Sequence, residues 1–382
     1  MIKHVNAHIY PSTFRNDSRI LKETESLIKL GLVQTIFMIG IWEEGLPRFE
    51  KIDENRSIIR IPQKFKKRKG FVFFVLKYLY YQFQVIGELH KLKVNIVNCH
   101  SLAVLGIGVY FKIFKNLFLI YDTHELSTEV AGSRGLKKIA GKIFERICIY
   151  FVDEVIVVND SIGNWYKKKY NIKNLGVLRN VPHFFELKLK PDLFREKFNI
   201  PKDQLIFIYQ GLLSKGRGIN IIIDAFLESE QNHHIVFMGM GEMADEVKTL
   251  SHKKSNIHFI PAVPASEVRK YTASADVGIH LIQNTCLNHY YCSPNKVFEY
   301  LMYGIPQIVS DFPEIRNIIY QGECGWLVNP EKKNLLMLLE NFTRAEVKEK
   351  TKAVLERRNE LGWEKEEASL VEVYGRLNNK MQ

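Results

Sequence analysis

Cysteine is scarce in this sequence, and long apolar runs are missing from it. The five cysteines are widely spaced and include no C-x-x-C pair, so neither a disulfide framework nor a zinc site is indicated. The longest apolar segments, SLAVLGIGVYF and FVFFVL, end at lysine well short of the roughly 20 residues that span a bilayer. The first residues also lack the order of a signal peptide. We therefore expect a cytoplasmic protein without a membrane-spanning helix.

Low-complexity tracts and short repeats are absent as well, which excludes disordered and repeat-built proteins. The 382 residues exceed what one hydrophobic core usually serves, so two domains are expected. In both halves, short β-branched runs alternate with amphipathic stretches, as in DSRILKETESLIKLG before VQTIFMIG and INIIIDAFLES before HIVFMG. This alternation predicts an α/β protein with two doubly wound, Rossmann-like parallel sheets, each covered by helices on both faces.

Residues 180–203 interrupt the alternation with prolines and mixed charge, which is typical of a linker. We place an N-terminal domain at 1–183, a C-terminal domain at 184–360 and a final helix at 361–382. That helix comes too late to belong to the strand rhythm of the second sheet. A ligand is expected outside the carboxyl ends of the strands, in a cleft between the domains.

The segment SPNKVFEYLMYG, residues 293–304, carries signals for both ends of a helix. Ser293 is predicted as the N-cap, Pro294 as the first helical residue and Gly304 as the residue after the end. The N–H groups of Asn295 and Lys296 would then lack intrahelical acceptors. Such a helix start attracts phosphate.

Glu299 lies one turn further into this helix, and its side chain leans back toward the start. A carboxylate can accept hydrogen bonds from both hydroxyls of a ribose, so the pairing indicates a nucleotide diphosphate. An exposed acid paired with Lys296 is the ordinary alternative. The apolar surroundings, VFEYLMYGIPQIV, disfavour that alternative because an unpaired charge there would be costly.

Two glycine-rich loops follow strands in the second half of the chain. The segment YQGLLSKGRGI places Gly211, Lys215 and Arg217 between a strand and a helix. Glycine lets the backbone approach an anion, and arginine supplies a fork of donors. The segment HIVFMGMGEMA fits G-x-G-x-x-A through Gly239 and Gly241.

The second loop also fits a dinucleotide-binding dehydrogenase. That alternative requires an acidic residue at the end of the next strand. The next strand is HFIPAV, which contains Ile260 and no acid. We expect this stretch to bind a nucleotide base through its backbone and shape instead.

Polar residues also lie where elements of the first domain begin or end. His124 in YDTHE and His100 in VNIVNCH follow predicted strands, so both would project at carboxyl ends. A lone histidine is more often structural, but this placement favours a functional His124. Asp17 and Arg19 begin the first long helix and are candidates to contact a substrate, although Asp17 could equally be a helix cap.

Basic residues outnumber acidic ones, with a formal net charge of +12. Part of the excess lies in 64–69, just before an aromatic stretch that includes Phe71 and Phe74 at helical spacing. The pattern predicts either a solvated loop followed by a core helix, or a peripheral contact of Lys64–Phe74 with the anionic inner face of the cytoplasmic membrane. No nucleic-acid partner is expected.

The order and spacing of these segments resemble the retaining, nucleotide-sugar-dependent glycosyltransferases of family 4. The resemblance runs through DSRILKETESLIKLG, YDTHE, YQGLLSKGRGI, GMGE, SADVGIHL, SPNKVFEYLMYGIPQIVSD and GWEKEEASLVEVYGRL. It implies the GT-B fold, with the last helix crossing back to the N-terminal domain. It also implies sugar transfer, with retention, from a nucleotide diphosphate sugar to a hydroxyl of a glycan or lipid-linked acceptor. A nucleotide-sugar 2-epimerase or a non-catalytic partner subunit of the same fold stays open as the alternative.

The resemblance assigns roles to particular residues. Glu299 would bind the donor ribose, and His124 would contact the donor sugar near the reacting carbon. Asp122 and Glu125 would orient His124 or the acceptor. Arg217 stands where the family usually has lysine and would neutralise the departing phosphate, so no metal or other cofactor is expected.

The sequence departs from the family pattern at two positions. Tyr291 replaces the first glutamate of the E-x7-E motif, which leaves the donor-sugar contacts open. Leu212 replaces the arginine that usually follows the loop glycine. The second departure places more of the phosphate charge on Arg217, with help from Lys215.

Overall fold

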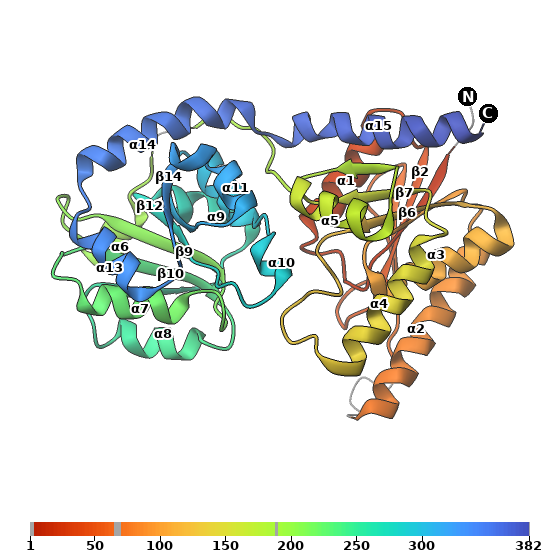
Figure 1. Ribbon diagram of the computed structural model, residues 1–382, viewed down its shortest axis with the longest axis horizontal. Helices are drawn as coiled ribbons and strands as arrows, with labels where there is room; N and C mark the ends of the chain where they lie inside the picture. The colour runs from red at the N-terminus through yellow and green to blue at the C-terminus, as the bar shows by residue number, and fades with distance from the viewer. Residues whose placement is uncertain (1–3, 65–69, 188–189, 382) are drawn as a thin grey trace. The chain divides into compact units, whose positions relative to one another are not determined.

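The computed structural model describes residues 4–64, 70–187 and 190–381, which form two compact units (Figure 1). Unit 1 contains the residues up to Asn180 and those from Glu366 onward, and unit 2 is Val181–Lys365. Residues 181–183 and 361–365, which we had placed outside the second domain, thus belong to unit 2. A hydrogen bond of 3.0 Å from the Trp363 N–H to the Pro182 carbonyl joins these two segments.

Unit 1 is built on an eight-stranded sheet in the order β3-β4-β2-β1-β5-β6-β7-β8. Its strands are β1 (Val5–Ile9), β2 (Thr35–Ile41), β3 (Phe49–Lys51), β4 (Arg56–Ile61), β5 (Ile96–Cys99), β6 (Phe118–Thr123), β7 (Glu154–Val157) and β8 (Leu175–Val177). All neighbours are parallel except β3 and β4. The prediction of a purely parallel sheet is therefore wrong at this edge, where a short connection turns the chain back on itself.

Helices cover both faces of this sheet. They are α1 (Ser18–Lys29), α2 (Phe71–Lys91), α3 (Leu102–Lys115), α4 (Gly135–Ile149), α5 (Asp160–Tyr170) and α15 (Trp363–Met381). Successive residues of β6 show the two faces, because Tyr121 contacts Glu145 of α4 and Asp122 contacts Arg19 of α1. The C-terminal part of α15 packs on the sheet, where Arg376 pairs with Glu154 of β7 at 2.8 Å.

Unit 2 has a fully parallel six-stranded sheet in the order β11-β10-β9-β12-β13-β14. The strands are β9 (Ile206–Leu212), β10 (His234–Met240), β11 (Ile257–Pro261), β12 (Val277–His280), β13 (Gln307–Ser310) and β14 (Gly325–Val328). The helices are α6 (Leu193–Phe198), α7 (Ile219–Glu228), α8 (Ala244–Ser251), α9 (Ala265–Ala273), α10 (Leu287–Tyr290), α11 (Asn295–Met302), α12 (Pro313–Ile318), α13 (Lys332–Glu340) and α14 (Arg344–Arg357). Helix α6 lies within the segment that we expected to be a linker.

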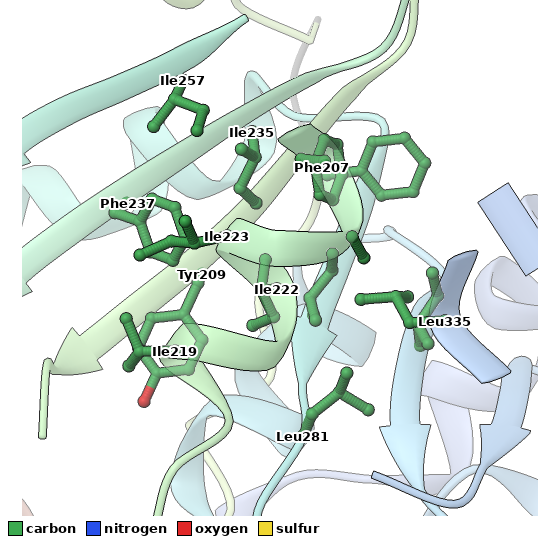
Figure 2. Close-up of a cluster of buried hydrophobic side chains, with 14 of the residues drawn as sticks. Phe207, Tyr209, Ile219, Ile222, Ile223, Ile235, Phe237, Ile257, Leu281 and Leu335 are labelled. Carbon is green, nitrogen blue, oxygen red and sulfur yellow. The ribbon is translucent and has the colours of Figure 1, made fainter. Parts of the chain in front are cut away.

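The largest core cluster of unit 2 surrounds β9 and β10 (Figure 2). Phe207 and Tyr209 alternate along β9 and, with Phe237 of β10, point to the same face of the sheet. Helix α7 covers that face with buried isoleucines, Ile219, Ile222 and Ile223. This packing holds the carboxyl ends of β9 and β10, and hence the loops that follow them, in place.

No helix in the described part of the chain combines the length and the hydropathy needed to cross a bilayer.

Replacing Phe207 by alanine should lower the free energy of unfolding by about 3–5 kcal/mol, because removal of the buried aromatic ring would leave a cavity. Phe207 is fully buried, with its ring centroid 5.3 Å from those of Phe226 and Phe342. Urea titration followed by circular dichroism measures the change. The control, Met337→Ala, removes a side chain that is 62% exposed and should shift stability by no more than about 0.5 kcal/mol. Equal losses for both variants would contradict this picture of the core.

Candidate functional site

The ends of β9 and β10 and the start of α11 enclose a pocket of about 490 Å³ in unit 2. Six residues that the sequence predicted for a nucleotide site line it: Gly211, Arg217, Gly239, Asn295, Lys296 and Glu299. Three others do not line it. The Ile260 side chain packs in the core instead, and Ala262 and Val263, which follow it, line the pocket.

The ends of β9 and β10 and the residues just after them approach closely because glycines lie at the contact. A Cβ on Gly239 would collide with the carbonyl oxygen of Gly211, and one on Gly241 would collide with that of Leu213. The carboxylate of Glu242 accepts a hydrogen bond of 3.0 Å from the Lys215 N–H. Gly241 and Lys215 therefore support the loop rather than line the pocket.

Helix α11 begins at Asn295, one residue later than predicted. Pro294, not Ser293, is the N-cap residue, with extended φ and ψ of −69° and 136°. The first intrahelical bond runs from the Val297 N–H to the Pro294 carbonyl at 3.0 Å. The N–H groups of Asn295 and Lys296 precede that bond, so the start of the helix carries the partial positive charge that attracts anions.

The Lys296 side chain adds a buried ammonium group to this helix start. Lys296 is 9% exposed, and its Nζ has no hydrogen-bond partner among the described residues. The Nζ lies 3.8 Å from the centroid of the Tyr209 ring, a cation–π contact, and near Gly211. Burial, helped by the charge of Arg217, lowers the pKa of Lys296 to about 7. An anion in the pocket would compensate this charge.

Glu299 is held by a short chain of polar side chains. Its Oε2 accepts a hydrogen bond of 2.5 Å from Gln210 Nε2, and Gln210 Oε1 accepts one of 2.5 Å from Thr272 Oγ1. Gln210 therefore orients the carboxylate, while the Lys296 ammonium is directed at Tyr209. The sequence did not single out Gln210 or Thr272, although Gln210 is the polar end of the buried run IFIYQ.

A larger cavity, of about 700 Å³, lies at the other end of α11. It contains Tyr303 and Gly304, and Arg269 and Lys270 line it from α9. It lacks the glycine loops and the helix start, so the smaller pocket is the better candidate site. Tyr291, which replaces the family glutamate, lines neither of these two cavities.

Unit 1 contains a second candidate site, a buried polar network at the end of β6. Asp122 is fully buried, and its Oδ1 lies 2.7 Å from Arg19 Nη2. Its Oδ2 lies 3.0 Å from His100 Nδ1 and 3.4 Å from His124 Nε2. Burial alone would raise the pKa of Asp122, but Arg19 and His124 hold it well below its usual value. Asp122 is therefore ionised and compensated by Arg19.

The network continues from His100 to His8 and Asn6. Their hydrogen bonds determine which nitrogen of each histidine ring carries the proton. His100 Nε2 lies 2.9 Å from His8 Nδ1, and His8 Nε2 lies 3.1 Å from Asn6 Nδ2. Because the amide nitrogen only donates, His8 Nε2 accepts and His8 Nδ1 carries the proton. His100 then accepts at Nε2 and donates from Nδ1 to Asp122. Burial lowers the pKa of His100 to about 4 and that of His8 well below its usual value, so both rings are neutral.

Helix α15 completes the network. The Tyr374 hydroxyl accepts a hydrogen bond of 2.7 Å from Asn6 Nδ2 and donates one of 3.3 Å to Asn98 Oδ1. Asn98 Nδ2 donates to Glu23 Oε1 at 3.3 Å. Burial and the nearby charge of Asp122 raise the pKa of Glu23 well above its usual value. Burial therefore favours the protonated form of Glu23, and Asp122 with Arg19 forms the ion pair of the network.

His124 is the partly exposed end of this network. His124 Nε2 lies 3.2 Å from His100 Nδ1 and 3.4 Å from Asp122 Oδ2, so this nitrogen faces the network and Nδ1 is turned away from it. The ring centroid of Tyr10 lies 5.3 Å from that of His124. The His124 ring is thus held in a defined orientation, as a substrate-binding histidine requires.

The remaining first-domain candidates lie in different surroundings. Arg19, which we expected to contact an acceptor, is buried in its ion pair with Asp122. Asp17 occupies the N-cap position of α1 but makes no capping bond, and its carboxylate accepts from Ser12 Oγ at 2.5 Å. The Glu125 side chain is exposed.

Two groups of described residues bring metal-ligating atoms within 4.8 Å of one another: His8, Glu23 and His100, and His100, Asp122 and His124. The first group is fully buried, and burial favours the protonated form of Glu23, which is a poor ligand. In the second, the permanent charge of Arg19 on the same carboxylate opposes a cation. Both groups are therefore better explained as parts of the hydrogen-bonded network than as metal sites.

The basic segment is only partly described. Lys66, Lys67, Arg68 and Lys69 lie outside the described residues, as does the side chain of Phe71. Lys64 Nζ lies 5.0 Å from the ring centroid of Tyr80. Phe74 is 62% exposed, so the first turns of α2 do not form the buried core helix that was one of the alternatives.

Comparisons with known proteins agree with this geometry. Residues 191–360, which contain the pocket, match the family model described as Glycosyl transferases group 1. No curated protein sequence matches the chain.

Solved structures share the whole architecture. Sucrose-phosphate synthase from Thermosynechococcus elongatus has a TM-score of 0.79 at 14% identity, covering 99% of this chain and 100% of that one. Anabaena HepE in complex with UDP and glucose has a TM-score of 0.73 at 11% identity, covering 98% and 100%. WaaG, a glycosyltransferase involved in lipopolysaccharide biosynthesis, has a TM-score of 0.64 at 14% identity, covering 97% and 99%. The chain therefore has the GT-B fold.

Two carboxyl-to-amide substitutions should affect stability differently. Asp122→Asn leaves the Arg19 charge buried without its counter-ion and should lower the free energy of unfolding by about 3–5 kcal/mol. Glu23→Gln keeps a neutral group where burial favours the protonated carboxyl, so stability at pH 7 should equal or exceed that of the parent.

The pH dependence distinguishes the same two sites. Because the pKa of Glu23 is raised on folding, its stabilising contribution is complete below the unfolded value of about 4.3 and is lost as pH rises. Urea titrations between pH 5 and 8 should therefore show a flatter profile for Glu23→Gln than for the parent. A large loss of stability at pH 7 for Glu23→Gln would mean that Glu23 is ionised.

Proposed function

We propose that this protein is a retaining glycosyltransferase that moves a sugar from a nucleotide diphosphate sugar to a hydroxyl of a glycan or lipid-linked acceptor. The observation that carries the proposal is the buried Lys296 ammonium, which has no hydrogen-bond partner among the described residues and lies at a helix start in the same pocket as Glu299. The group 1 glycosyltransferase match over 191–360 and the UDP complexes of HepE support it.

The pocket suits the parts of such a donor. The diphosphate would accept hydrogen bonds from the N–H groups of Asn295 and Lys296 and face the charges of Arg217 and the Lys296 ammonium. The ribose hydroxyls would donate to Glu299, whose carboxylate Gln210 already orients. The Glu299 carboxylate, which would repel the diphosphate, thus lies one helical turn away from the position that we propose for it.

The Lys296 side chain also explains how the site could do without the arginine that Leu212 replaces. Its Nζ lies 3.4 Å from the position that a Cβ on Gly211 would occupy, next to residue 212. A cation from α11 therefore reaches the end of β9, from which the family arginine would extend. We propose that Lys296 and Arg217 together neutralise the charge that grows on the leaving phosphate, so that no metal cofactor is needed.

Retention is proposed to occur by front-face attack. The acceptor hydroxyl attacks the anomeric carbon, the glycosidic bond to the phosphate breaks, and the leaving phosphate oxygen takes the acceptor proton. This course requires no carboxylate nucleophile. The proposed role of His124 is to contact the transferred sugar, with Asp122 and His100 fixing its ring orientation.

Incubation with a panel of nucleotide sugars, with and without membrane extract, tests the reaction. Release of free nucleotide only when acceptor is present supports a transferase, and the anomeric configuration of the product, read by NMR, tests retention. A changed sugar without acceptor would identify a 2-epimerase. Nucleotide binding without turnover on any pair would support a non-catalytic subunit.

Affinity for a nucleotide diphosphate sugar should fall as pH rises above 7. The pKa of Lys296 is about 7 in the free protein, and the diphosphate should raise it, so binding takes up a proton above that pH. The affinity for the nucleotide diphosphate sugar should be constant below pH 7 and should weaken by up to about tenfold per pH unit above it. Calorimetry in buffers of different ionisation enthalpy would measure both the affinity and the proton uptake.

Two variants serve as controls for Lys296. Lys296→Arg keeps the charge at every pH, so its affinity should not change over the same range. Lys296→Met should bind weakly at all pH values, and adding Leu212→Arg should restore part of the affinity by supplying the cation from the loop. A pH profile that survives in Lys296→Met would assign the titration to another group.

A further inference from the structure

Helix α4 has an apolar stripe on its exposed side. Leu136 is 85% exposed, and Ile139, Ile143 and Ile147 are each more than half exposed. The spacing of three and four residues places them along one face of the helix, which Tyr150 extends past its end. An amphipathic helix of a soluble domain normally turns such a face toward the core.

The exposed side of α2 also carries apolar side chains. Val72, Leu79 and Phe83 are exposed and lie along one face of the helix, whereas the exposed Phe74 lies on the opposite face. Both helices pack against the first turns of α3, because the Tyr78 hydroxyl of α2 donates to the Ala103 carbonyl at 2.8 Å and the Phe144 ring of α4 lies against Gly106.

Helices α2 and α4 both contact α3 in unit 1, as can be followed in Figure 1. We call this surface the α2–α4 face and define it by its apolar residues: Val72, Leu79, Phe83, Leu136, Ile139, Ile143, Ile147 and Tyr150.

The charges around this face are positive. Arg134, Lys137 and Arg146 are exposed on or beside α4. The one acid within 130–152 is Glu145, which is fully buried and accepts hydrogen bonds of 2.7 Å from the tyrosines of α5. Within 70–87 of α2 the one charged residue is Lys77. No exposed acid therefore opposes an anionic surface over either segment.

We propose that the α2–α4 face docks on an anionic lipid bilayer. The apolar side chains would enter the boundary between headgroups and acyl chains, and the three exposed basic residues would meet the lipid phosphates. A second copy of this chain fits less well, because two faces of the same positive charge would repel each other. The proposal does not depend on glycosyl transfer and rests only on residues of unit 1.

Cosedimentation with vesicles tests the proposal directly. The full-length protein should sediment with phosphatidylcholine vesicles that contain phosphatidylglycerol and much less with phosphatidylcholine alone. The protein should be released as salt rises, because the screening length falls from about 30 Å at 0.01 M to about 3 Å at 1 M.

Two sets of substitutions separate the apolar and charged contributions. Changing Ile139, Ile143 and Ile147 to serine should abolish sedimentation at every salt concentration. Changing Arg134, Lys137 and Arg146 to glutamine should weaken binding about fivefold per residue, on the order of 100-fold together.

The matched control changes Lys248, Lys253 and Lys254 of unit 2, which are also exposed, to glutamine. It removes the same charge and should bind like the parent. Circular dichroism melting checks that each variant is folded.

Two results would overturn the proposal. The first is sedimentation of the folded serine variant at the level of the parent. The second is a parent that is dimeric by light scattering without lipid and does not bind vesicles, while the serine variant is monomeric. That outcome would assign the face to a second copy of the chain. Neither result depends on donor turnover, so failure here leaves the proposed reaction separately testable.

Discussion

Parallel strand pairing is the constraint on which both candidate sites depend. Strands that run in the same direction end at the same edge of a sheet, so residues far apart in the chain meet there. In unit 1 this edge brings His100, after β5, next to Asp122 and His124 of the β6 end. In unit 2 it brings the loops after β9 and β10 together, and glycines allow the close approach.

The two units differ in how their buried charges are compensated. In unit 1 the charge of Asp122 is matched by Arg19, and neutral histidines, amides and Glu23, whose protonated form burial favours, fill the rest of the network. Such a network is stable without a ligand and gives the partly exposed His124 ring a defined orientation. In unit 2 the Lys296 ammonium lies against a tyrosine ring and has no hydrogen-bond partner among the described residues, and burial lowers its pKa. That site gains stability when an anion binds.

Departures from the usual rules of folding are informative in this protein. A soluble domain normally pairs its buried cations and covers its apolar helix faces. Lys296 departs from the first rule, and the α2–α4 face departs from the second, although the cores of both units are otherwise well packed. The partners that we propose, a diphosphate for Lys296 and an anionic bilayer for the α2–α4 face, would make each departure favourable.

Local sequence patterns were sufficient for the features that depend on short segments. The strand and helix alternation predicted two α/β units, and SPNKVFEY placed a helix start beside Glu299. The glycines at 211 and 239, which we expected in loops, lie in the last residues of β9 and β10. The antiparallel edge strand β3 and the partners Gln210, His8 and Glu23 were not predicted. The direction of the Lys296 side chain toward Tyr209 was likewise decided only by the fold. These features arise from contacts between segments distant in the chain, and side-chain direction and protonation depend on burial that only the packed structure creates.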